Sequence, residues 1–144
     1  MKIYMDVCCL NRPFDDLSQD RIYLESEAVL AIISRCEKDS WVLVASGAID
    51  FELSKMQDLD RLEQVRKLYS VAQIRIGLSA DIEYRAAILQ QHGVRPFDSL
   101  HVASAESCSA DVLLTTDDRL IKVTNRIDLN VRVANPLHLL IGGA

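Results

Sequence analysis

Four acidic residues stand where the sequence offers them no ordinary structural partner: Asp6, Glu52, Asp98 and Asp117. Asp6 directly follows the apolar segment 2–5, and Asp117 directly follows the segment 112–116. Ligands of open α/β sheets gather at the carboxyl ends of the strands, so we expect both carboxylates at that edge. Oxygen donors without sulfur or nitrogen select hard cations, Mg²⁺ or Mn²⁺ rather than Zn²⁺. The chemistry to expect is therefore metal-assisted.

The other two acids lie on helix faces that should be packed. Glu52 falls within the apolar stripe that includes Ile49 and Leu53, and Asp98 occupies the first turn of a predicted helix in line with Val102. An unpaired charge on a packed face costs several kcal/mol, so each carboxylate needs a partner. A cluster of such acids raises its own pKa values unless a cation lies among them.

Each acid taken alone has a plainer interpretation. Asp98 and Asp117 are good helix N-caps, Asp6 suits a turn, and Glu52 can lean into solvent. These explanations are independent of one another, whereas one bound cation accounts for all four acids. We therefore predict a metal site at these positions, with Asp118 as an alternative to its neighbour Asp117.

Short apolar runs alternate with longer amphipathic stretches, and this pattern predicts the elements that carry the acids. Strands are expected at 2–5, 41–45, 73–76, 112–115 and 131–134. Helices are expected at about 18–36, 46–56, 58–70, 79–93, 96–108 and 118–124, the first capped by Ser18 and the second by Ser46. Alternating strands and helices imply right-handed crossovers and a parallel sheet between helical layers, an α/β fold.

The composition is that of one compact domain, which we place at residues 1–144, with 49% hydrophobic and 26% charged residues. No apolar run approaches the roughly 18 residues that cross a membrane, and Asp6 falls where an export signal would be apolar. We therefore expect a cytoplasmic protein without a membrane partner. The cysteines lack metal-site spacing, and we interpret all of them as reduced structural thiols: Cys8, Cys9, Cys36 and Cys108.

The net charge of −5, from 16 basic and 21 acidic side chains, counts against a nucleic-acid partner. That objection weakens if the four acids hold cations, because bound divalent ions reverse the local sign of the potential. Charge alone leaves the partner open.

The acids also lie in short motifs that resemble those of PIN-domain ribonucleases. The matching stretches are Asp6-Val7-Cys8-Cys9-Leu10-Asn11, Ser46 six residues before Glu52, the run from Asp98 to Ala105, and Leu114-Thr115-Thr116-Asp117. The resemblance spans residues 1 to about 134. It departs from the family at Val7, where many members carry Ser or Thr.

This resemblance implies an α/β PIN-like fold in which Asp6, Glu52, Asp98 and Asp117 hold one or two Mg²⁺ or Mn²⁺ ions. It implies hydrolysis of RNA phosphodiester bonds by a metal-activated water. Small PIN proteins of this length are most often toxins of VapC-type toxin–antitoxin pairs, so the implied partners are an RNA substrate, an antitoxin protein and a second copy in a homodimer.

Residues near the predicted site in sequence supply further candidates. The basic ones could contact RNA phosphates without reading sequence: Arg12, Lys55, Arg95, Arg119 and Lys122. Single-stranded or looped RNA is the expected substrate, because a base-paired stem would shield the backbone from a recessed pocket. We expect His101 to form hydrogen bonds within the helix layer rather than to act as a base.

Two alternatives remain open from the sequence. One is a PIN-like scaffold that binds RNA or protein without catalysis. The other is a receiver-type phosphoacceptor domain, also a βα protein with acids and Mg²⁺ at strand ends. The receiver alternative is weak, because it needs adjacent acids after the first strand and a lysine after the last, and neither is present.

Overall fold

A computed structural model describes residues 1–38 and 40–141, and at Ile141 only the backbone. Its centre is a parallel sheet in the order β3-β2-β1-β4-β5. The strands are β1 (Lys2–Met5), β2 (Val42–Ser46), β3 (Ile74–Ile76), β4 (Val112–Leu114) and β5 (Arg132–Ala134). The predicted α/β class is confirmed. The receiver alternative is wrong, because that fold orders its strands 2-1-3-4-5.

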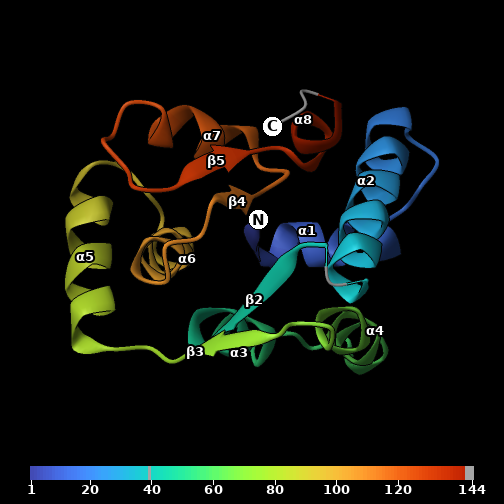
Figure 1. Cartoon of the computed structure of the whole chain (residues 1–144), viewed down its shortest axis with the longest axis horizontal. Helices are drawn as coiled ribbons and strands as arrows, with labels where there is room; N and C mark the ends of the chain where they lie inside the picture. The colour runs from blue at the N-terminus through green and yellow to red at the C-terminus, as the bar shows by residue number, and fades with distance from the viewer. Residues whose placement is uncertain (39, 142–144) are drawn as a thin grey trace.

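Helices connect successive strands and cover the sheet. Their bounds are α1 (Val7–Asn11), α2 (Asp20–Glu37), α3 (Gly47–Leu53), α4 (Leu59–Tyr69), α5 (Ala80–Gln91), α6 (Pro96–Ser107), α7 (Asp118–Thr124) and α8 (Pro136–Ile141), with a 3₁₀ turn η1 (Arg12–Phe14). In Figure 1, α5 and α6 lie on one side of the sheet and α1, α2 and α4 on the other. No helix in the described part of the chain is long and apolar enough to span a membrane.

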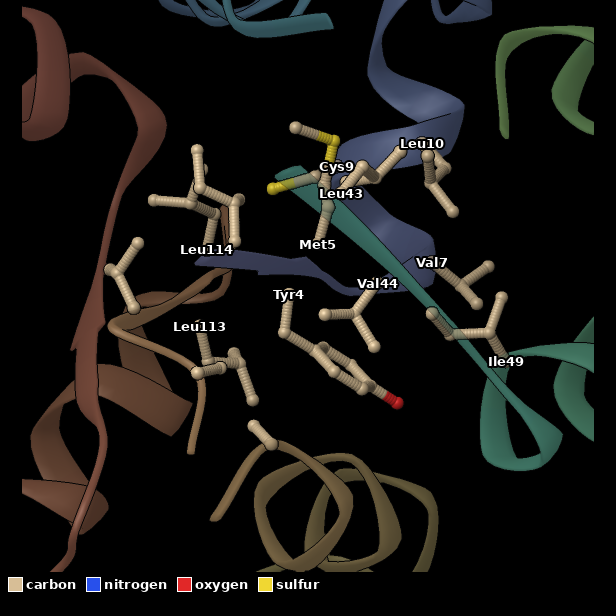
Figure 2. Packing of buried hydrophobic residues seen from close by; sticks show 14 of the residues in the cluster. Tyr4, Met5, Val7, Cys9, Leu10, Leu43, Val44, Ile49, Leu113 and Leu114 are labelled. Atoms are coloured by element: carbon tan, nitrogen blue, oxygen red, sulfur yellow. The ribbon is translucent and has the colours of Figure 1, made fainter. Parts of the chain in front are cut away.

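Both faces of the sheet are buried at its central strands. Figure 2 shows Met5 and Leu114 on one side of the paired strands β1 and β4, and Tyr4 and Leu113 on the other. All four side chains are at most 1% exposed. Burial on both faces explains why the strands are nearly continuous apolar runs, which is typical of parallel sheets between helical layers.

Local signals placed most helix boundaries correctly. Ser46 caps α3 by accepting a hydrogen bond from the Ile49 N–H, and Pro96 opens α6. Gly93, with φ of +98°, follows the end of α5, where a left-handed residue favours glycine.

Three expectations about the elements were wrong or incomplete. Ser18 does not cap α2, which begins at Asp20 after Gln19 and has no side-chain cap. Helix α3 ends at Leu53 rather than near Met56. The short helices α1 and α8 were not predicted, because elements of five or six residues are too short to show a helical period.

Candidate functional site

The strand order of the sheet reverses between β1 and β4. Crossovers run outward from β1 through β2 to β3, and the chain then returns to pair β4 on the other side of β1. Ligands of open α/β sheets bind at such a reversal point. Asp6 directly follows β1, and Asp117 follows β4 after two threonines, so both predicted acids lie at this edge.

Asp6 is buried, at 2% exposure, without an ion-pair partner among the described residues. Its Oδ1 accepts a hydrogen bond from the Cys9 N–H at 3.0 Å, which caps α1. Burial raises the pKa of Asp6 from 3.8 to about 6, and the nearby Asp98 adds to the rise. Hydrogen bonds from Thr115 and Cys9 and the charge of His101 oppose it. The protein thus holds a carboxylate where ionisation is costly.

Asp98 lies in the first turn of α6 and is half-buried. Within the described residues its carboxylate makes no hydrogen bond or ion pair. Burial raises its pKa, and repulsion from Asp117 and Glu52 raises it further, while His101 and Arg95 act in the opposite direction. The Asp98 carboxylate oxygens are therefore available to a ligand, and the charges of the other acids repel the ionised form.

Glu52 has a protein partner that the sequence pattern did not reveal. Its Oε1 lies 2.7 Å from His101 Nε2, and the other ring nitrogen of His101 lies 2.7 Å from the Tyr4 hydroxyl. The same hydroxyl lies 2.7 Å from Ser46 Oγ. His101 is only 1% exposed, so this series of hydrogen bonds fixes Glu52 to the core. His101 forms a hydrogen bond within the helix layer, to Glu52 on α3, as expected, but its second hydrogen bond reaches strand β1. Tyr4 was missed because a strand tyrosine carries no distinguishing signal.

All four predicted acids are near enough to Cys8 to act on the charge of its thiol. Burial raises the pKa of the Cys8 thiol well above its usual range, and the carboxylates that add to the rise are Asp6, Asp98, Glu52 and Asp117. The interpretation of Cys8 as a structural thiol in apolar surroundings was wrong, because the residue lies at the surface rather than in the core, and carboxylates act on its partly desolvated thiol. All four cysteines are free thiols, as expected.

Asp117, rather than its neighbour Asp118, is the acid that acts on Cys8 and Asp98. Asp117 caps α7 through the Arg119 N–H at 2.9 Å, and its own N–H donates to Thr115 Oγ1 at 3.1 Å. Asp118 points instead to α2, where Arg21 binds both of its carboxylate oxygens at 2.8 Å. Thr115 therefore contacts two site acids, since it also forms a hydrogen bond with Asp6.

The predicted basic residues divide into two groups. Arg12 is held by ion pairs to Glu25 and Asp15, so its guanidinium is already partnered. The other four are exposed and make no ion pair within the described residues: Lys55, Arg95, Arg119 and Lys122. The second group keeps its charge available for a ligand.

One comparison with known proteins bears on the fold. No protein-family model and no curated protein matches the chain. The crystal structure of VapBC2 from Rickettsia felis, bound to a DNA fragment from their promoter, contains a chain of similar structure, with a TM-score of 0.59 and 17% identity. The likeness covers 94% of this chain and 98% of that chain. The chain has a VapC-like PIN-domain fold.

Within this PIN-like fold the acids do not form a closed metal cage. Among residues 1–38 and 40–141, no three His, Cys, Asp or Glu side chains stand together in a group that could hold a metal ion. The donor set nevertheless suits Mg²⁺, which takes only one or two carboxylates and fills its remaining positions with water and phosphate oxygens. Asp6 and Asp98 are near enough to repel each other and offer such a pair.

Proposed function

We propose that this protein is a metal-dependent ribonuclease in which Asp6, Glu52, Asp98 and Asp117 hold Mg²⁺ or Mn²⁺. The observation that carries the proposal is that Asp6 and Asp98 have raised pKa values, act on each other, and have no ion-pair partner in the described structure, while Glu52 and Asp117 add to the repulsion on Asp98. Proteins rarely leave buried acids uncompensated without a function.

The residues of the chain have separate parts in this chemistry. A bound divalent ion would activate a water for in-line attack on a phosphodiester and neutralise charge on the leaving oxygen. Asp6 and Asp98 are the best direct ligands, because burial raises the pKa of both and neither carboxylate has an ion-pair partner among the described residues. His101 orients Glu52, and Thr115 orients Asp6 and Asp117, so the acids keep their positions before substrate arrives.

We further propose that the chain is the toxin of a toxin–antitoxin pair. The support is its fold, which it shares with a chain of the VapBC2 structure. On this proposal a cognate antitoxin protein binds the ribonuclease and blocks it, and the ribonuclease itself forms a homodimer. Expression of the chain alone should arrest growth, and co-expression of the cognate antitoxin should restore it. Continued growth on expression of the chain alone would contradict the toxin assignment.

The nuclease proposal is tested by incubating purified protein with single-stranded RNA in Mg²⁺, Mn²⁺ or EDTA. Cleavage is expected with either metal and not with EDTA. Asp98→Asn should abolish cleavage, whereas the matched variant Asp118→Asn should keep it, because Asp118 is committed to Arg21. If the wild-type protein binds RNA but cleaves none of it with either metal, the non-catalytic binding alternative replaces the proposal.

A further inference from the structure

Two phenylalanines stand directly before two of the site acids. Phe51 precedes Glu52 on α3, and Phe97 precedes Asp98 on α6. Their rings lie 5.6 Å apart between centroids, at an interplanar angle of 54°. The same two helices thus carry the acids and the rings, and the two rings meet where α3 approaches α6.

This ring pair is only partly covered by protein. Phe51 is 45% exposed, and Phe97 is half-buried. Single exposed apolar residues are common on protein surfaces, as Tyr84 on α5 illustrates at 73% exposure. The two rings differ from such a case, because they contact each other and each directly precedes a predicted site acid in the sequence.

Two cations accompany the rings. The Lys55 ammonium lies 4.9 Å from the centroid of the Phe51 ring. Arg95 is exposed at the start of α6 and is close enough to act on the charge of Asp98. Neither cation makes an ion pair with a carboxylate among the described residues. Lys55 thus places a positive charge against the ring pair, Arg95 precedes Phe97 by two residues, and neither is bound to a protein anion in the described structure.

We propose that Phe51 and Phe97 form a stacking platform for an unpaired base of single-stranded RNA, with Lys55 and Arg95 contacting the adjoining phosphates. The proposal deepens the ribonuclease function and rests on it. Aromatic side chains bind splayed-out bases by stacking, and they do so with little preference because every base has a π-face. A base paired within a duplex cannot reach the rings. Single-stranded or looped RNA should therefore bind more tightly than a duplex of the same sequence.

The platform is tested with a short single-stranded RNA that carries one 2-aminopurine, whose fluorescence is quenched on stacking. The wild-type protein should quench it. Phe51→Leu should remove the quenching and raise the Kd about tenfold, since stacking on one aromatic ring strengthens binding by about that factor. Phe51→Trp should restore both. Lys55→Gln should weaken binding in low salt and leave the quenching of bound RNA intact.

Controls separate stacking from loss of structure. Tyr84→Leu removes an exposed aromatic ring far along the chain and should change neither quenching nor affinity. Thermal unfolding of Phe51→Leu should remain close to that of the wild type, because the altered ring is already partly exposed. Phe97→Leu provides a second variant on the other helix, with the same expected loss of quenching.

The outcomes distinguish the platform from the nuclease. If wild-type protein cleaves RNA while Phe51→Leu keeps full affinity and quenching, the platform is wrong and the ribonuclease stands. If wild-type protein quenches the probe but cleaves no RNA, the platform stands and the catalytic proposal fails. If Phe51→Leu changes only the oligomeric state or antitoxin binding, the rings dock protein rather than a base, and the platform is overturned.

Discussion

The two buried acids Asp6 and Glu25 differ in whether a cationic side chain neutralises them. Glu25 on α2 is 0% exposed and accepts hydrogen bonds from Arg12 at 3.0 Å, Arg21 at 3.1 Å and the Asn135 amide at 2.6 Å. Asp6 is 2% exposed and has hydrogen bonds from Cys9 and Thr115 but no cationic partner in the described structure.

The difference separates an acid that stabilises the fold, Glu25, from one that is available for chemistry, Asp6. Around Glu25 two guanidinium groups neutralise the carboxylate. Arg12 connects α2 to η1, and the Asn135 amide connects α2 to the segment before α8. At the carboxyl edge of β1 no such group is supplied, so ionised Asp6 destabilises the protein unless a cation arrives from outside. Substitutions at the two acids should therefore separate stability from activity.

The largest expected effect is on catalysis. Asp6→Asn should lower the rate of RNA cleavage about a hundredfold or more, because a charge that clamps the metal is lost. Asn keeps an oxygen that can cap α1, so the fold should be as stable as the wild type or more stable. Cleavage assays and urea unfolding of the same preparation check both parts. Undiminished cleavage by Asp6→Asn would contradict the assignment of Asp6 to the catalytic site.

Glu25→Gln should show the reverse pattern. Loss of the charge leaves Arg12 and Arg21 without their shared partner, and we expect a cost of about 2 kcal/mol, typical of hydrogen bonds to charged groups. The rate of RNA cleavage by the folded fraction should be unchanged. Urea unfolding measures the first effect. A variant with wild-type stability would show that the Glu25 network contributes little net free energy.

The pH dependence of stability should separate the same two acids. Because the pKa of Asp6 is raised from 3.8 to about 6, the folded state binds more protons than the unfolded state between these values. Stability of metal-free protein should therefore fall as pH rises from about 4 to 6, by up to about 3 kcal/mol from this group.

Unfolding curves across that range, compared between wild type and Asp6→Asn, isolate this contribution. The variant should lack it, so its stability relative to wild type should grow as pH rises. A constant difference between the two proteins would mean that the pKa of Asp6 is ordinary in the folded state.

The sequence predicted the acids better than it predicted their partners. Asp6 and Asp117 follow apolar strands directly, and the rule for parallel sheets then places them at one edge. By contrast, Glu25 and Asn135 are 110 residues apart, and their hydrogen bond depends on how α2 packs against α8. Periodicity does not encode such packing.

The dependence on tertiary packing also explains why the sequence analysis missed Tyr4 and misplaced Cys8. Tyr4 and His101 meet only because β1 and α6 lie against each other, so the chain that holds Glu52 was not visible in the sequence. Cys8 was assigned to the core from its apolar neighbours, although α1 turns its side chain toward the acids. Short elements and side-chain direction are set by tertiary packing rather than by local pattern.

The smallest effect is expected at the surface pair of Arg21 and Asp118. Both side chains are more than half exposed, so Asp118→Asn should cost about 0.5 kcal/mol or less, as is usual for exposed ion pairs. The rate of RNA cleavage should not change. Urea unfolding and the cleavage assay measure the two quantities, and a large loss of activity would return Asp118 to the site in place of Asp117.

Cation binding by Asp6 and Asp98 is the central requirement of the proposed chemistry. Calorimetric titration of the purified protein with Mn²⁺ tests it directly. Wild-type protein and Glu25→Gln should bind Mn²⁺, and EDTA should reverse the binding. Asp6→Asn and Asp98→Asn should bind it far more weakly while remaining folded. Absence of Mn²⁺ binding by the wild type, or equal binding by all four proteins, would contradict the account.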